Sequence, residues 1–193
     1  IAREGIPCVG VDASPEMLKV FRDKAPPPNL TLVEGRMQTL DLGEQRFRLI
    51  TCPFRAFSHL LDVADQLAAL ARIRHHLAPG GAFALDVFDP KLDRLAARFE
   101  PESLAVTVQH EGHEIRRWDS STRDHTRQVL TVHFRFEGGP PEMSGTTHMD
   151  LRWFYRYELE HLLFRAGFTE VTFYGGFDRR PWAAFGETIV VAR

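Results

Sequence analysis

Strands and helices alternate through the first half of the chain, and this order constrains the fold more than any other feature. Short apolar segments typical of buried strands lie at residues 7–12, 30–33, 47–54 and 82–88. A helix is expected after Ser14-Pro15-Glu16, and residues 62–77 form a second one. Parallel strands joined through helices make right-handed crossovers. We therefore predict an α/β fold with a Rossmann-like, mostly parallel sheet and helices on both faces.

The second half has a different pattern. Apolar and polar residues alternate in the segments 104–108, 113–118, 128–136 and 146–154. Alternation of this kind predicts antiparallel strands with one solvated face. A helix at 157–165 and strands at 171–174 and 187–192 follow, the last strand running antiparallel. We predict a single domain over residues 1–193 with an antiparallel β-meander inserted at 104–154 as a lid.

Composition narrows the class of protein. The 193 residues are 44% hydrophobic and 26% charged, with a formal net charge of −2. Like charges do not cluster, so neither nucleic acid nor a membrane surface is expected as partner. No apolar run approaches the roughly 20 residues that cross a bilayer. Two isolated cysteines, Cys8 and Cys52, favour a reducing, cytoplasmic setting.

Ligands of open parallel sheets bind where the strands end, and the first two strand ends carry candidate residues. Asp12 ends the first strand, where one carboxylate can accept hydrogen bonds from both ribose hydroxyls. The alternative is a helix-capping role, which Ser14 already fits. After the second strand, Gly35 allows close backbone approach and Met37 can lie on a planar base, although such a Met is more often in the core.

The third strand ends in the unusual stretch 52–59, Cys-Pro-Phe-Arg-Ala-Phe-Ser-His. Pro53 ends the ladder of hydrogen bonds, so the chain is expected to turn out of the sheet there. Aromatic side chains, a cation and His59 would then meet at the mouth of the sheet. In the alternative, Phe54 and Phe57 belong to the core and Arg55 is solvated.

Three motifs in this order resemble the class I S-adenosylmethionine-dependent methyltransferases. Residues 9–18, V-G-V-D-A-S-P-E-M-L, resemble the family's segment after its glycine-rich loop. Residues 76–83, H-L-A-P-G-G-A-F, are similar to the turn before its fifth strand. The helix at 158–168, with E-L, L-L and A-G-F, is similar to the one before its sixth strand. The order and spacing agree across nearly the whole chain.

This resemblance implies S-adenosylmethionine as cofactor and transfer of its methyl group to a small-molecule amine or hydroxyl. Asp12 would hold the ribose, and the other implied cofactor-binding residues are Ala13, Met17, Gly35, Arg36, Met37, Cys52, Pro53, Phe54 and Phe57. An amine acceptor needs no base once unprotonated, whereas a hydroxyl needs one such as His59. Tyr155 is a second catalytic candidate, and Arg55, Arg156 and Tyr174 are candidates for acceptor binding. A homodimer is also possible.

No metal site is expected. His110, Glu111 and His113 suggest a cluster, but on strand-like backbone the two histidines would point to opposite faces. Two other functions stay open: a nicotinamide-dependent oxidoreductase, which also places an acid on a ribose, and a non-catalytic binding protein of the same fold.

One departure from the family concerns the N-terminal side. The family's first strand and G-x-G-x-G loop would precede Ile1, and residues 1–5 resemble the tail of a helix closed by Gly5. That strand is central in the family's sheet. We therefore expect a gap in the sheet of these 193 residues, filled by more of the same protein or by a partner strand.

Overall fold

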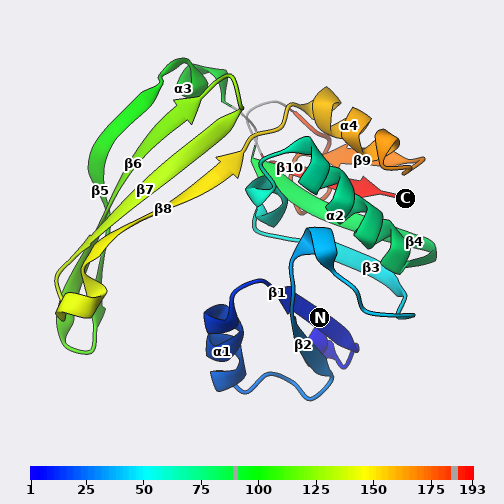
Figure 1. Ribbon diagram of the computed structural model, residues 1–193, viewed down its shortest axis with the longest axis horizontal. Helices are drawn as coiled ribbons and strands as arrows, with labels where there is room; N and C mark the ends of the chain where they lie inside the picture. The colour runs from blue at the N-terminus through cyan, green and yellow to red at the C-terminus, as the bar shows by residue number, and fades with distance from the viewer. Residues whose placement is uncertain (89–90, 184–186) are drawn as a thin grey trace.

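A computed structural model describes residues 1–88, 91–183 and 187–193 (Figure 1). The chain opens with a short 3-10 helix, η1 (Ala2–Glu4), that ends at Gly5 in the left-handed conformation, with φ 81°. A β–α–β unit follows. Its strands β1 (Cys8–Asp12) and β2 (Leu30–Glu34) pair in parallel and flank helix α1 (Pro15–Asp23). Ser14 caps α1 as expected, because its Oγ accepts the N–H of Met17 over 3.1 Å.

A second sheet contains four strands in the order β3-β4-β10-β9. Their bounds are Phe47–Cys52 for β3, Leu77–Phe88 for β4, Val171–Tyr174 for β9 and Glu187–Ala192 for β10. β3 and β4 are parallel, and β10 runs antiparallel to both of its neighbours. The prediction of an antiparallel last strand is therefore confirmed.

Two helices accompany this sheet: α2 (Val63–His76) and α4 (Arg156–Arg165). α2 begins at the cap Asp62, whose Oδ1 accepts the N–H of Asp65 over 2.9 Å. The main core lies between these helices and the sheet. Its fully buried members include Leu70 of α2, Leu163 of α4, Phe83 of β4 and Val190 of β10.

The turn predicted at Pro79-Gly80-Gly81 lies within the bounds of β4. Pairing begins at Phe47 with Leu77, is interrupted by an irregularity, and resumes at Leu49 with Ala82. Gly80 has a φ of 71°. A Cβ at Gly81 would lie 2.9 Å from the carbonyl oxygens of Ala78 and Phe47, so only glycine fits there. The irregularity therefore depends on this glycine pair.

The parallel strands are divided between two sheets instead of forming one. β1 pairs with β2 alone, and β3 pairs with β4 alone, so β1 and β3 each end a sheet. Figure 1 shows the β1–α1–β2 unit on the β3 side of the larger sheet. The gap expected from the sequence therefore lies between β1 and β3.

Strands β5 (Phe99–His110), β6 (His113–Asp124), β7 (Val129–Glu137) and β8 (Gly145–Arg152) form an antiparallel sheet in that order. We call this sheet the antiparallel arm, because it projects away from the rest of the molecule (Figure 1). Its strands begin at residue 99, earlier than the predicted 104. Four short helices complete the described chain: η2 (Met37–Thr39), η3 (Ala56–His59), η4 (Pro141–Met143) and α3 (Leu92–Ala96).

Charged contacts fix the base of the antiparallel arm to α4. The guanidinium of Arg152 donates to Glu158 Oε1 over 2.9 Å and to the carbonyl oxygen of Leu61 over 3.1 Å. The side-chain amide of Gln128 donates to Glu158 Oε2 over 2.8 Å. Glu158 thus joins the last two strands of the arm to the helix that follows them.

Candidate functional site

The ends of β1 and β2 meet at Asp12. The N–H of Gly35 donates to the carbonyl oxygen of Asp12 over 3.0 Å. The exposed Asp12 carboxylate accepts the N–H of Ser14 through Oδ1 over 2.8 Å. Its Oδ2 has no hydrogen-bond partner among the described residues. One oxygen therefore braces the turn into α1, and the other is left for a ligand at the exposed end of β1.

The remaining candidates of the β1–β2 unit differ in exposure. Ala13, Met17 and Arg36 are exposed, Met17 by 58%. Met37 is half-buried, packs against the core and accepts a contact from the Cys52 thiol over 3.6 Å between the sulfur atoms. Met37 thus connects the loop after β2 to the end of β3.

The chain leaves β3 through a strained turn. Pro53 follows the last residue of the strand, as expected. Phe54 and Arg55 then adopt the left-handed conformation, with φ of 58° and 59°. Non-glycine residues in this region cost roughly 1–3 kcal/mol each and cluster at functional sites. The ring of Phe54 is 93% exposed.

The turn is held by a residue that sequence reasoning missed. Asp86, near the end of β4, is only 6% exposed, and its Oδ2 accepts the N–H of Arg55 over 3.1 Å. The guanidinium of Arg55 reaches Glu187 Oε1 at 3.3 Å and lies 5.8 Å from the ring centroid of Phe88. An acid inside the apolar run Leu85-Asp86-Val87 was the available sequence signal. We call this edge, formed by Cys52–Arg55, Asp86–Phe88 and Glu187, the carboxyl edge.

Burial raises the pKa of the Cys52 thiol from an ordinary 9.0 to about 12, and the negative charge of Asp86 adds to this shift. The thiol is therefore protonated at neutral pH. Cys52 offers an apolar wall with a weak S–H donor at the carboxyl edge.

Phe57 corrects an expectation. It is completely buried, and its ring packs on Phe154 with 5.6 Å between centroids. The 3-10 turn η3 directs this side chain into the core, so it has no surface to offer a ligand. His59, at the end of the same turn, is exposed instead.

The acceptor candidates lie near the start of α4 and the end of β9. Tyr155 precedes α4 and is 43% exposed. The Arg156 guanidinium carbon lies 4.8 Å from the ring centroid of Trp182 and 5.1 Å from that of Phe173. Tyr174 ends β9 and bridges to Pro181. Within the described part of the chain, no hydrogen bond or ion pair joins these residues to Arg55.

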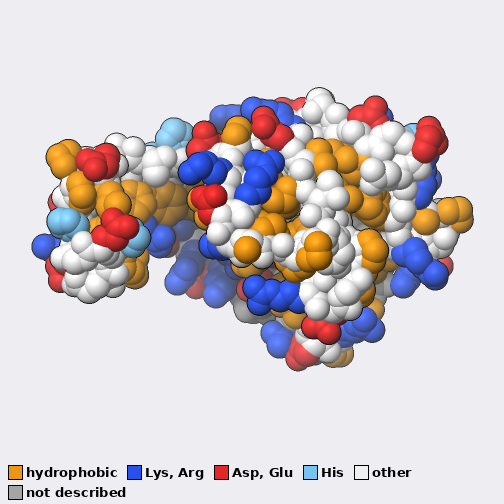
Figure 2. All heavy atoms as spheres, turned by 90° about the horizontal axis from the view of Figure 1, so that it is seen from below, with side chains coloured by type: hydrophobic (Ala, Val, Ile, Leu, Met, Phe, Trp, Pro, Cys, Tyr) orange, Lys and Arg blue, Asp and Glu red, His pale blue; other side chains and the backbone are white. Residues whose placement is uncertain are grey.

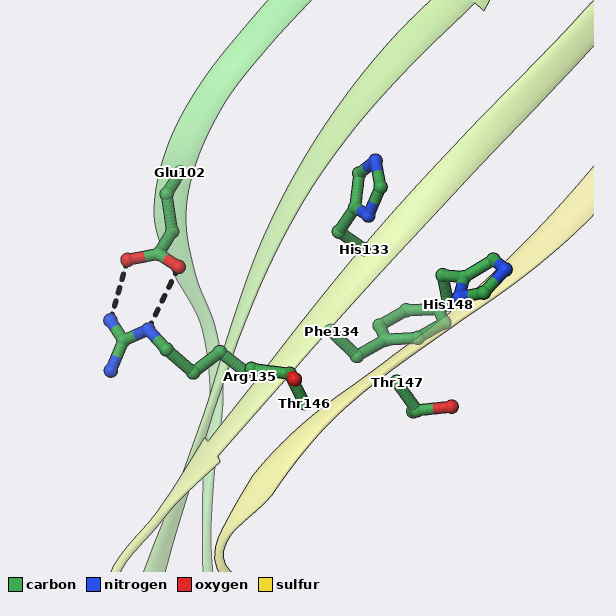
Figure 3. Close-up of a pocket in the computed structure, with 7 residues that line it drawn as sticks. All are labelled: Glu102, His133, Phe134, Arg135, Thr146, Thr147 and His148. Carbon is green, nitrogen blue, oxygen red and sulfur yellow. Dashed lines mark hydrogen bonds and ion pairs between the residues drawn. The ribbon is translucent and has the colours of Figure 1, made fainter.

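A cavity of about 340 Å³ lies on the antiparallel arm, apart from the strand ends. It is lined by Glu102, His133, Phe134, Arg135, Thr146, Thr147 and His148 (Figure 3). The guanidinium of Arg135 is bound to Glu102, and this hydrogen bond lowers the pKa of that carboxyl. In this cavity the charges of Arg135 and Glu102 already neutralise each other, so the carboxyl edge is the better candidate for ligand binding.

The expectation that His110 and His113 point to opposite faces was wrong. β5 and β6 form a hairpin that places His110 directly opposite His113, on the same face of the sheet. Even so, among the described residues no three His, Cys, Asp or Glu side chains are arranged to hold a metal ion. In the same part of the chain, no helix has the length and apolarity to cross a membrane.

Comparison with known proteins gives consistent results. A family model described as a methyltransferase domain matches residues 1–81. The dTDP-3-amino-3,6-dideoxy-alpha-D-glucopyranose N,N-dimethyltransferase of Streptomyces fradiae is 28% identical over 171 residues, which are 86% of this chain and 63% of that protein. The chain therefore spans less than two thirds of the length of this curated relative.

Solved structures agree with this match. The CcbJ methyltransferase from Streptomyces caelestis has a TM-score of 0.82 and 28% identity, over 100% of this chain and 76% of that one. CalS10, an amino pentose methyltransferase from Micromonospora echinaspora, has a TM-score of 0.71 and 29% identity, over 95% and 72% of the two chains. No oxidoreductase is among these relatives, and that alternative is not favoured. The family model over residues 1–81 and these similar proteins are consistent with a class I S-adenosylmethionine-dependent methyltransferase.

Proposed function

We propose that this protein transfers a methyl group from S-adenosylmethionine to the amino group of a small molecule. The observation that carries the proposal is the Asp12 carboxylate, which keeps one oxygen without a partner among the described residues, beside Gly35. The names of the similar proteins support the acceptor class, because the Streptomyces fradiae relative is an N,N-dimethyltransferase and CalS10 acts on an amino pentose.

The residues present fit the cofactor. A carboxylate with a free oxygen at a strand end suits ribose hydroxyls, which are hydrogen-bond donors. Arg36 and the half-buried Met37 follow directly and would flank the adenine, with Ala13 and Met17 on the other side. Cys52, Pro53 and Phe54 would face the methionine part. Bound there, S-adenosylmethionine supplies an activated methyl group on a sulfonium.

The contribution of the chain is to align the acceptor and exclude water. Arg55, Arg156 and Tyr174 are our candidates for acceptor binding, and Tyr155 directly precedes Arg156 at the start of α4. An amine must be unprotonated at the moment of methyl transfer, so no strong base is required. His59 is exposed on η3 and would act as a base only toward a hydroxyl acceptor.

We also propose that a further strand lies between β1 and β3 in the working protein. Both strands end a sheet there and leave hydrogen-bonding groups unpaired with any described strand. Isothermal titration with S-adenosylmethionine would test this by comparing these 193 residues with a longer product of the same gene. We expect the longer protein to bind much more tightly, and equal affinities would contradict the proposal.

Residues 104–154, the greater part of the antiparallel arm, are proposed to act as a lid within one methyltransferase domain over residues 1–193.

We further propose that two copies of the protein associate through this arm. β5 lies at its edge and exposes Val106 by 39% and Val108 by 45%. Figure 2 shows apolar side chains exposed on the arm. Sedimentation equilibrium should give a dimer that Val106→Lys weakens, and a monomeric wild type would exclude it.

We propose a cytoplasmic location for this protein. Cys8 and Cys52 are both free, which favours a cytoplasmic, reducing setting.

The acceptor class is tested with the full-length protein and a matched pair of sugars, dTDP-3-amino-3,6-dideoxy-α-D-glucopyranose and its 3-hydroxy counterpart. Methylation of the amino sugar alone is expected. Transfer to the hydroxyl sugar alone, or to neither, would contradict an amine acceptor.

A further inference from the structure

Asp86 is a buried carboxylate at the carboxyl edge. Its neighbours on β4, Leu85 and Val87, are buried in the core at 2% and 1% exposure. Asp86 itself is 6% exposed. Oδ2 accepts the N–H of Arg55 over 3.1 Å, and Oδ1 has no hydrogen-bond partner among the described residues. The carboxylate therefore keeps most of its acceptor capacity unused.

No cation of the described chain is paired with this carboxylate. Arg55 binds Asp86 through its backbone N–H, but its guanidinium forms an ion pair with Glu187 instead. The undescribed residues 89–90 and 184–186 include no Lys, Arg or His, so they cannot supply the missing cation. A buried carboxylate without a counter-charge is unfavourable unless other donors reach it. A cationic ligand would remove this cost.

The position of Asp86 indicates which ligand that is. Its charge acts on Cys52, whose thiol contacts Met37 on the proposed adenine side. The strained Phe54–Arg55 turn is fixed by the hydrogen bond to Asp86 Oδ2. Asp86 therefore lies next to the proposed methionine part of the cofactor, where an acceptor has to bring its nitrogen.

We propose that Asp86 binds the amino group of the methyl acceptor, through a charge-assisted hydrogen bond from the ammonium to Oδ1. This assignment rests on the proposed amine methyltransferase function. An ammonium carries the positive charge and the N–H donors that the carboxylate lacks, whereas a hydroxyl offers one neutral donor. Asp86 thus selects amines over hydroxyls and holds the nitrogen at the carboxyl edge until it releases its proton to solvent.

The test is a titration of the full-length protein saturated with S-adenosylhomocysteine, using the amino sugar and its 3-hydroxy counterpart as probes. Asp86→Asn keeps an acceptor for the Arg55 N–H and removes the charge. We expect about tenfold weaker binding of the amino sugar or more, with unchanged binding of the hydroxyl sugar. Asp86→Glu should recover part of the loss. Asp178→Asn, which changes an exposed acid in the loop after β9, is the matched control.

The outcomes show whether Asp86 binds the ammonium of the acceptor or that of the cofactor. A variant that binds the amino sugar as the wild type does overturns the role of Asp86. Loss of S-adenosylhomocysteine affinity in Asp86→Asn would instead assign the carboxylate to the ammonium of the cofactor, which also overturns it. The proposed function itself fails if the wild type binds no S-adenosylhomocysteine. It also fails if the wild type never methylates an amine when S-adenosylmethionine is supplied. Thermal unfolding of each variant separates these results from loss of folding.

Discussion

The backbone N–H of Arg55 donates a hydrogen bond to Asp86 Oδ2 over 3.1 Å, which ties the turn after β3 to the end of β4. This contact holds two consecutive residues, Phe54 and Arg55, in the left-handed conformation. Such strain persists only where the surroundings over-determine the backbone. The hydrogen bond therefore links a buried charge to the shape of the proposed ligand site.

Asp12 is predicted to contribute to cofactor affinity through the ribose. Asp12→Asn retains an acceptor for the Ser14 N–H but loses the charge and one acceptor oxygen. Titration of the full-length variant with S-adenosylmethionine should show affinity lower by roughly tenfold to hundredfold. Asp23→Asn at the end of α1 is the control and should bind like the wild type. An unchanged affinity in Asp12→Asn would exclude the ribose role.

Phe57 and Phe54 test which aromatic side chains of this stretch stabilise the core and which are exposed at the ligand site. Phe57 is fully buried, so Phe57→Ala should lower the free energy of unfolding by about 3–5 kcal/mol. Phe54 is 93% exposed, and Phe54→Ala should change it by less than about 0.5 kcal/mol. Urea denaturation followed by circular dichroism measures both. Equal destabilisation by the two variants would show that the core has been assigned incorrectly.

Glu158 is predicted to hold the antiparallel arm in place. Glu158→Ala leaves Arg152 and Gln128 without their acceptors, and should cost about 2 kcal/mol in the free energy of unfolding. Glu160→Ala on the same helix is the matched control and is expected to be nearly neutral. Hydrogen exchange should also become faster at the base of the arm. A neutral Glu158→Ala would mean that this network does not stabilise the arm.

Cys52 predicts how stability depends on pH. Its thiol pKa is about 12 in the folded chain against an ordinary 9.0. Between these values the unfolded chain loses the proton and the folded chain keeps it, so stability falls as pH rises, by up to about 1.4 kcal/mol per pH unit. Below pH 9 this contribution is constant.

The stability difference between wild type and Cys52→Ser isolates this contribution. Denaturant titrations over a range of pH should show that any advantage of the wild type shrinks above pH 9. Cys8→Ser controls for the general effect of removing a thiol. Parallel stability curves for wild type and Cys52→Ser across the alkaline range would contradict the burial of a protonated Cys52.

Local patterns predicted much of this fold. Ser14 followed by Pro15 predicted the start of α1, and the strands at 171–174 and 187–192 have the predicted bounds. The early start of β5 was missed because Phe99-Glu100-Pro101-Glu102-Ser103 lacks a regular alternation. Pairing with β6 through an irregular register makes it a strand. Such pairing is a tertiary effect that a single segment does not encode.

The site was predictable only where chemistry and position coincide locally. Asp12 stood out because an acid ends a clear strand. Asp86 lies inside an apolar strand, and its role depends on a hydrogen bond with Arg55, which is 31 positions away in the chain. The resemblance to the family implied that Phe57 lies at the cofactor, but the turn η3 directs its ring into the core, as the alternative reading of this stretch allowed. The hairpin at Glu111–Gly112 likewise reversed the expected facing of His110 and His113.

Methyl transfer to nitrogen tests the central claim most directly. The full-length protein would be incubated with S-adenosylmethionine carrying a trideuteriomethyl group and with the 3-amino sugar nucleotide, and the product analysed by tandem mass spectrometry. The account predicts the labelled methyl group on the amino nitrogen, and stoichiometric S-adenosylhomocysteine. Label on a hydroxyl oxygen, or no labelled product from a protein that binds both ligands, would contradict it.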